Sequence, residues 1–225
     1  NNILVDHCKF KSIDQNNVSN FTISNCQGEK LLFTSCMDCL VKQSYFSSSD
    51  EFTCMGKVWG NLNIVDCNII NVHPQGKLFK HLYSANKDSS YLNIRQSKLV
   101  KHSGADETWN CNISFEENLI ETQGMTIKSN SKLLMMVNNI ISGGNNLSSS
   151  LISIPISSKV IWLNNEILKG YTALLDGNIR NKSTVFYSSE HDLKMTNYPE
   201  SLSIVNLDSA GIKWGHFNQR PANLK

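Results

Sequence analysis

Four charged residues in the middle of the chain have side chains suited to carbohydrate chemistry: Asp66, Arg95, Glu116 and Glu117. An inverting glycosidase holds two carboxyl groups roughly 6.5–9.5 Å apart, one as the acid and one as the base for a water. Asp66 and Glu117 are predicted to take these parts, with Glu116 beside them. Arg95 is predicted to orient a sugar carboxylate through a bidentate contact. These roles require residues far apart in the sequence to meet on one surface.

A short repeat supplies such a surface. Its template is an apolar residue, any residue, an apolar residue, two of any type, then Cys, Ser or Asn, any residue and an apolar residue. Copies begin at positions 3, 21, 39, 62, 92, 113, 134 and 160. The full matches are Ile3-Val5-Cys8-Phe10, Leu62-Ile64-Cys67-Ile69, Leu92-Ile94-Ser97-Leu99, Ile113-Phe115-Asn118-Ile120, Leu134-Met136-Asn139-Ile141 and Val160-Trp162-Asn165-Ile167.

The repeat predicts a stack of short strands. Each copy is too short for a helix and alternates apolar residues with period two. A strand of three or four residues cannot bury its face alone, but stacked coils bury a continuous core and pair the backbone groups along the axis. We therefore expect an all-β, right-handed parallel β-helix. Residues 1–170 are predicted to form its coils, and residues 171–225 the last coils and an irregular C-terminal cap or trimer-contact tail.

The sixth template position is expected to turn the chain between two strands. The Asn, Ser and Cys side chains there are also expected to bond or pack along the axis, as amide ladders do. Trp162 stands at an inward position and is expected in the core. Leu202–Leu207 is expected to form one more strand.

Outward positions form columns, because stacked coils lie ~4.8 Å apart. The column four positions after each start holds Asp66 and Glu117, two coils apart, which is ~9.6 Å by backbone spacing. Arg95 and Glu116 lie one position earlier, so the four residues are predicted to share one flank. The alternative is a solvated charged flank joined by salt bridges, without a catalytic part.

Aromatic and basic residues in the loops are candidate substrate-binding groups: Trp59, Tyr91, His102 and Trp109. Long insertions on a solenoid cluster on its binding face, and Trp and Tyr rings offer sugars flat apolar platforms. Trp59 and Trp109 could equally cap the loops' own cores. If the reaction is β-elimination, Arg95, Lys98 or His102 would act on an acidic sugar, so hydrolase and lyase both stay open.

The outward columns become apolar near the far end of the repeat, at Met135, Val137, Ile161 and Leu163. These side chains should be exposed on a lone solenoid, and an exposed apolar patch marks an interface. We expect subunit packing in a homotrimer. The alternative is a C-terminal segment that folds back over the patch.

Composition excludes several other classes. The formal net charge is +2, which gives no electrostatic footprint for nucleic acid. No apolar run approaches the ~18 residues that span a bilayer, and no cofactor motif is present. Seven cysteines, an odd count, favour reduced thiols, and the single CxxC of Cys36 and Cys39 is too weak a signal to predict a metal. The first residues look like a strand already under way, so we expect a piece of a longer protein.

The copies of the repeat resemble the coils, or rungs, of the pectate-lyase-like right-handed β-helices, and especially those of bacteriophage tailspike proteins. The resemblance covers about residues 3–170. The resemblance implies a homotrimer that binds or degrades a bacterial surface polysaccharide, capsule or lipopolysaccharide. It implies a place in the virion tail after assembly in the host cytoplasm. The alternatives are a non-catalytic glycan-binding adhesin or fibre shaft, and a secreted or cell-surface polysaccharide lyase.

Overall fold

The structure is a computed structural model, and it confirms the all-β parallel solenoid. It describes residues 2–58, 60–83, 91–103, 107–109, 111–123, 126–129, 132–144, 150–153, 159–169, 173–176, 183–187, 195–196 and 202–206. Within these ranges every regular element is a strand and the strand pairs are parallel. The described residues therefore contain no helix that could cross a membrane.

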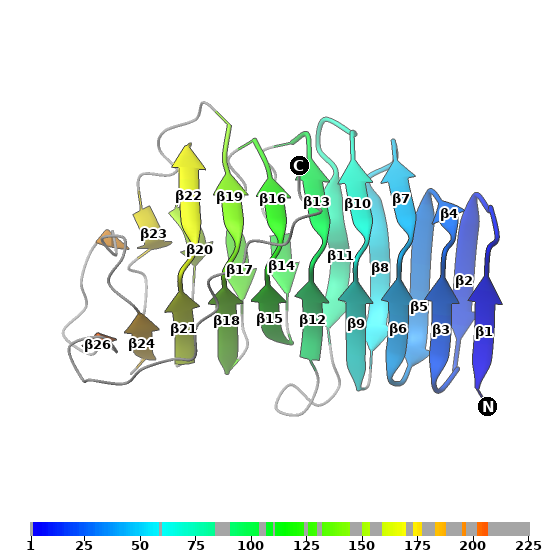
Figure 1. The fold of residues 1–225 in the computed structure, drawn as a ribbon, viewed down its shortest axis with the longest axis horizontal. Helices are drawn as coiled ribbons and strands as arrows, with labels where there is room; N and C mark the ends of the chain where they lie inside the picture. The colour runs from blue at the N-terminus through cyan, green and yellow to red at the C-terminus, as the bar shows by residue number, and fades with distance from the viewer. Residues whose placement is uncertain are drawn as a thin grey trace.

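One sheet carries the predicted repeat, and we call it the front sheet (Figure 1). Leu62, Leu92 and Ile113 are paired in register, as the repeat requires. All eight predicted copies contribute a strand, and two further strands follow them. In sheet order the strands are β1 (Ile3–Asp6), β3 (Phe21–Ser24), β6 (Cys39–Lys42), β9 (Asn61–Val65), β12 (Tyr91–Arg95), β15 (Asn112–Glu116), β18 (Leu133–Val137), β21 (Lys159–Leu163), β24 (Ser183–Tyr187) and β26 (Leu202–Asn206).

A second sheet, the side sheet, contributes one strand after each front strand from β3 to β21 (Figure 1). The expected extra strand near residue 202 belongs to the front sheet as β26, so that prediction is confirmed. The side strands are β4 (Gln27–Gly28), β7 (Tyr45–Ser48), β10 (Asn68–Asn71), β13 (Lys98–Lys101), β16 (Leu119–Glu121), β19 (Ile140–Ser142) and β22 (Glu166–Lys169).

The back of the solenoid consists of two separate sheets. The first back sheet contains β2 (Ser12–Asn16), β5 (Lys30–Cys36), β8 (Phe52–Val58) and β11 (Lys77–Tyr83). The second contains β14 (Glu107–Trp109), β17 (Ile127–Ser129), β20 (Ser150–Ser153), β23 (Ala173–Asp176) and β25 (Met195–Thr196). The template did not predict these strands, because the spacing between its copies varies there.

The chain turns from front to side sheet through one residue with a left-handed backbone. This conformation is uncommon outside glycine, and Asn, Asp and His adopt it most readily. The turn therefore lies one residue before the predicted sixth template position, and the prediction was wrong in this detail. The corner residues, with φ between 49° and 56°, are His7, Asn25, Gln43, Asp66, Gln96, Glu117, Asn138 and Asn164.

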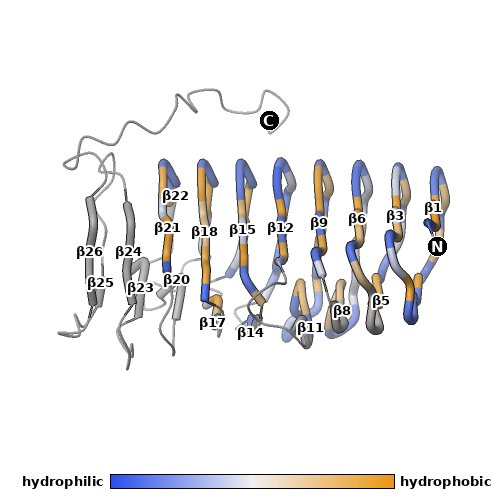
Figure 2. Tube along the Cα trace, turned by 90° about the horizontal axis from the view of Figure 1, so that it is seen from below, coloured by the Kyte–Doolittle hydropathy of each residue, from blue (hydrophilic) through white to orange (hydrophobic). Residues whose placement is uncertain are grey.

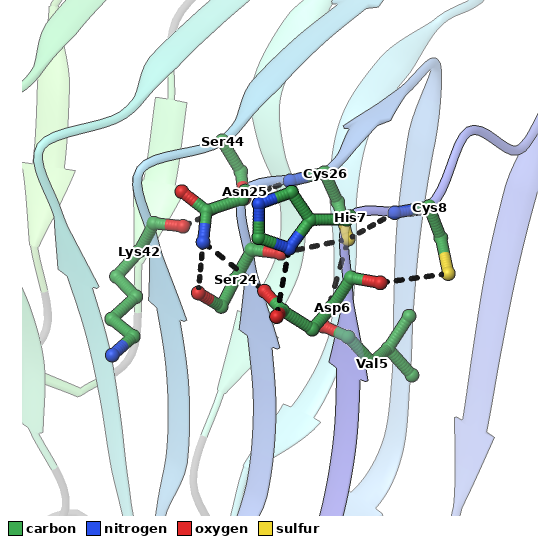
Figure 3. Close-up of polar contacts among 9 residues, drawn as sticks. All are labelled: Val5, Asp6, His7, Cys8, Ser24, Asn25, Cys26, Lys42 and Ser44. Carbon is green, nitrogen blue, oxygen red and sulfur yellow. Dashed lines mark hydrogen bonds and ion pairs between the residues drawn. The ribbon is translucent and has the colours of Figure 1, made fainter.

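From Cys26 to Asn165, the residue after each corner is buried and forms the predicted ladder, whereas Cys8 at the N-terminal end is exposed. Asn118 donates from its backbone N–H to the side-chain oxygen of Asn139 at 3.0 Å. Asn139 donates in the same way to Asn165 at 2.9 Å. The ladder begins at the other end with cysteine and serine, where the Cys26 N–H donates to the Ser44 hydroxyl (Figure 3). No buried side-chain N or O of the described residues lacks a hydrogen bond.

Apolar side chains fill the axis, and hydrophobic and hydrophilic positions alternate along the coils (Figure 2). Trp162 is 6% exposed and belongs to the core, as predicted. The outward apolar patch differs from expectation, because Met135, Val137 and Ile161 are half-buried and Leu163 is buried. Long apolar side chains on stacked coils lie close enough to cover one another. The predicted exposure was therefore wrong.

Candidate functional site

A hollow of about 300 Å³ lies on the outer face of the front sheet. It crosses four neighbouring strands, from β6 through β9 and β12 to β15. Most of its side chains come from outward positions of the repeat, where period-two alternation turns them away from the core. The lining residues are Leu40, Asn63, Val65, Asn93, Ile94, Arg95, Ser114 and Glu116.

Hydrogen bonds organise the polar groups of this hollow. The Asn93 amide donates to the side-chain oxygen of Asn63 at 2.9 Å, which joins two neighbouring coils. The Ser114 hydroxyl donates to Glu116 Oε1 at 3.1 Å. Arg95 is exposed and pairs with Glu116 in the strand register, yet no ion pair of Arg95 occurs among the described residues. Because Arg95 is exposed, a ligand can reach its guanidinium.

The two predicted catalytic carboxylates lie on the corner beside the hollow. Asp66 and Glu117 both have the left-handed backbone of the corner column. Asp66 is exposed, and Glu117 accepts a hydrogen bond from the Gln96 amide at 3.0 Å. Gln96, rather than Arg95, is thus the corner residue between them. The strand register keeps the two carboxylates two coils apart, ~9.6 Å by backbone spacing.

The aromatic and basic residues predicted to bind substrate do not lie together. Tyr91 is half-buried and begins β12, on the strand that carries Arg95. His102 is exposed but follows β13, so a whole strand of the side sheet separates it from the front-sheet corner. Trp59 lies outside the described residues. Trp109 ends β14 on the back of the solenoid, and its side chain also lies outside the description.

A second polar cluster occupies the same corner at the N-terminal end (Figure 3). Asp6 accepts hydrogen bonds from the Asn25 amide at 3.1 Å and from His7 Nδ1 at 2.8 Å. The bond from Asn25, followed by that from His7, holds the pKa of Asp6 below its ordinary value. The columns contained all three residues, but nothing in their spacing predicted the contacts between side chains.

A second hollow, of about 530 Å³, lies at the opposite end of the same strands, where the chain enters β1 and β3. It is lined by Asn2, Ile3, Leu4, Asn20, Thr22 and Asp38. Sequence reasoning missed it because Asn2, Asn20 and Asp38 precede the template, in a column that the repeat does not define. The front sheet thus presents amide and carboxylate groups along several coils.

This arrangement suits hydrogen bonding to a polar ligand better than metal chemistry. No group of three or more His, Cys, Asp or Glu side chains in the described part of the chain is placed to hold a metal ion. Amides, a hydroxyl, a carboxylate and an open guanidinium together provide donors and acceptors. No known protein family, curated protein or solved structure matches the chain.

Proposed function

We propose that the chain recognises a polysaccharide on the outer face of the front sheet. The 300 Å³ hollow carries this proposal, because it brings Asn63, Asn93, Arg95 and Glu116 together on one sheet. Solenoids of this kind occur in proteins that bind or degrade polysaccharides. Sugar hydroxyls need many donors and acceptors at fixed positions, and stacked strands supply them at ~4.8 Å intervals.

The open guanidinium of Arg95 favours a glycan with acidic residues. A guanidinium binds a carboxylate through two parallel hydrogen bonds, and Arg95 has no such partner among the described residues. We infer a bacterial capsule or lipopolysaccharide as the ligand, and a homotrimeric tailspike-type protein of a virion tail as the setting. These finer assignments rest on the likeness of the rungs to that class.

Binding is tested with purified capsular polysaccharides and lipopolysaccharides from a broad panel of bacterial strains. Arg95→Ala should weaken binding of a responding glycan roughly ten-fold or more, as loss of a charge-assisted hydrogen bond predicts. Tyr45→Ala is the control, since Tyr45 is exposed on the side sheet. No binding by the wild type to any acidic glycan of the panel, or equal binding by Arg95→Ala, would contradict the proposal.

Cleavage is the second candidate function. The observation that favours it is the placement of Asp66 and Glu117 on one corner at a backbone spacing near that of inverting glycosidases. Glu117→Gln should abolish release of reducing ends or unsaturated sugars while the protein stays folded. Glu121→Gln, a carboxylate change on the side sheet, should retain release. If the wild type binds a glycan but releases no reducing ends or unsaturated sugars, the remaining interpretation is an adhesin or a fibre shaft.

A further inference from the structure

The two hollows of the front sheet are joined by one column of outward residues. In the register of the parallel strands this column runs through Leu4, Thr22, Leu40 and Asn63. Its first two residues line the 530 Å³ hollow, which we call the second hollow, and its last two line the 300 Å³ hollow, the first hollow. Thr22 on β3 and Leu40 on β6 are direct neighbours. One extended ligand can therefore contact both hollows.

The joined surface crosses the front sheet obliquely. The first hollow reaches the C-terminal ends of its strands, at Arg95 and Glu116. The second hollow reaches the residues that precede β1 and β3, at Asn2 and Asn20. Five strand intervals separate β1 from β15 in the sheet, which is ~24 Å along the solenoid axis. A surface of this length suits several units of a linear polymer.

The two hollows differ in charge. The first is lined by one cation, Arg95, and one carboxylate, Glu116, which accepts a hydrogen bond from the Ser114 hydroxyl at 3.1 Å. Among the described residues that line the second hollow, Asp38 alone is charged. Because opposite charges attract and like charges repel at short range, a carboxylate of the ligand is favoured at Arg95 and disfavoured at Asp38.

Contacts with the next coil hold the Asp38 carboxylate in place. Asp38 is exposed and has a φ of 52°, and its Oδ1 accepts a hydrogen bond from the Asn61 N–H at 3.0 Å. Gly60 leaves room for this approach, because a Cβ at Gly60 would lie 2.5 Å from the same oxygen. A carboxylate held in this way can accept a further, charge-assisted hydrogen bond from a sugar hydroxyl.

We propose that the two hollows bind one heteropolysaccharide, with an acidic sugar at Arg95 and a neutral sugar at Asp38. The inference rests on the proposed glycan recognition and adds the composition and the direction of the ligand. The exposed Leu4 side chain gives the apolar face of the neutral sugar a packing surface. A polymer of uronic acid alone would place a carboxylate beside Asp38 and should therefore contact the first hollow only.

The first test uses a responding glycan whose repeat contains a uronic acid and a neutral sugar, cleaved by mild acid and separated by size. Hydroxyl-radical footprinting reports on each hollow, since Leu4 is 64% exposed at the second and Leu40 and Val65 line the first. Single repeats should protect Leu40 and Val65 only. Fragments longer than ~24 Å should also protect Leu4 and should bind ten-fold tighter or more, because the second contact becomes intramolecular.

The second test is Asp38→Asn. Asparagine keeps an oxygen for the Asn61 N–H and tolerates the left-handed backbone, so the variant removes the charge and not the turn. Binding of the long fragments should weaken roughly ten-fold, while binding of single repeats should stay unchanged. Asp14→Asn is the matched control, because Asp14 is exposed on β2 at the back of the solenoid, and it should bind both sizes as the wild type does.

Each failure has a distinct meaning. Long fragments that leave Leu4 unprotected, or that bind Asp38→Asn and the wild type equally, would overturn the inference and leave glycan recognition by the first hollow intact. So would a panel in which only polymers of uronic acid bind. Equal weakening of single repeats and long fragments by Asp38→Asn would give Asp38 a structural part and overturn the inference as well. If no glycan binds the wild type, the proposed function itself is contradicted, and this inference with it.

Discussion

At each corner two adjacent residues meet different structural requirements: the first must adopt a left-handed backbone, and the second must place its side chain in the ladder. Asn138 has a φ of 55°, a conformation that glycine adopts without steric penalty. Asn139 lies in the core, where its amide donates to the Phe115 carbonyl and to the Asn165 side chain. Asparagine is therefore used for its backbone conformation at position 138 and for its hydrogen-bonding amide at position 139.

Substituting each asparagine in turn should distinguish these two roles by their effects on the free energy of unfolding. Asn138→Gly should change the free energy of unfolding by less than about 1 kcal/mol. Asn139→Ala should lower it by about 2–4 kcal/mol, because it removes an amide and leaves buried partners unsatisfied. Urea unfolding of both variants measures the difference. Equal destabilisation would contradict the assignment of corner and ladder positions.

Thiol reactivity is a second prediction at the residue scale. Cys8 is exposed, whereas Cys67 and Cys111 are buried, and burial raises the pKa of each buried thiol to about 12. Only the thiolate attacks an alkylating reagent, so at pH 8 iodoacetamide should modify Cys8 far faster than Cys67 or Cys111. Peptide mapping by mass spectrometry identifies the modified residues. Fast labelling of Cys67 in the folded protein would contradict the buried ladder.

At the scale of elements, the sequence predicted the front strands and not the back ones. The apolar alternation of Leu62 and Ile64 marks a strand wherever it occurs, and the constant template sets the register between coils. The hydrogen bonds of Glu107 with Leu78 and Phe79 could not be predicted, because they join segments without a common pattern. For the candidate site, the columns placed Asp66, Arg95, Glu116 and Glu117 on neighbouring coils, but not the contacts of Gln96 or Asn63.

An ion pair on the first back sheet predicts how the stability of the protein changes at acidic pH. Lys80 on β11 contacts Glu51 at 2.6 Å, and its charge lies 5.5 Å from the centre of the Phe52 ring. The hydrogen bond from Lys80, and its charge, hold the pKa of Glu51 below the ordinary value. A lowered folded-state pKa adds stability above the ordinary carboxyl pKa, and that stability is lost as the pH falls through the folded pKa.

Lys80→Met should therefore be slightly less stable than the wild type at pH 7, and the difference should vanish near pH 2. Urea midpoints measured from pH 7 to pH 2 provide the comparison. Both groups are partly exposed, so the difference at pH 7 should be small. A difference that persists unchanged at pH 2 would assign the effect to packing on Phe52 instead of the charge.

At the scale of the whole molecule, exposed apolar side chains near one end of the solenoid are candidates for a contact between subunits. Leu168 on β22 is 56% exposed, and Ile167 beside it is also exposed. A homotrimer that packs the coils around this end would bury both. Sedimentation velocity of the wild type should then show a trimer, and Leu168→Glu should shift it towards the monomer. A monomeric wild type at micromolar concentration would contradict the proposed assembly.

The central claim is that the outer face of the front sheet binds a polysaccharide, and hydroxyl-radical footprinting tests it most directly. Leu40 and Val65 line the hollow, while Tyr45 and Leu168 are exposed on the side sheet. With a saturating amount of a glycan that binds, oxidation of Leu40 and Val65 should fall while that of Tyr45 and Leu168 stays unchanged. Unchanged oxidation of Leu40 and Val65, or protection confined to the side sheet, would contradict the claim.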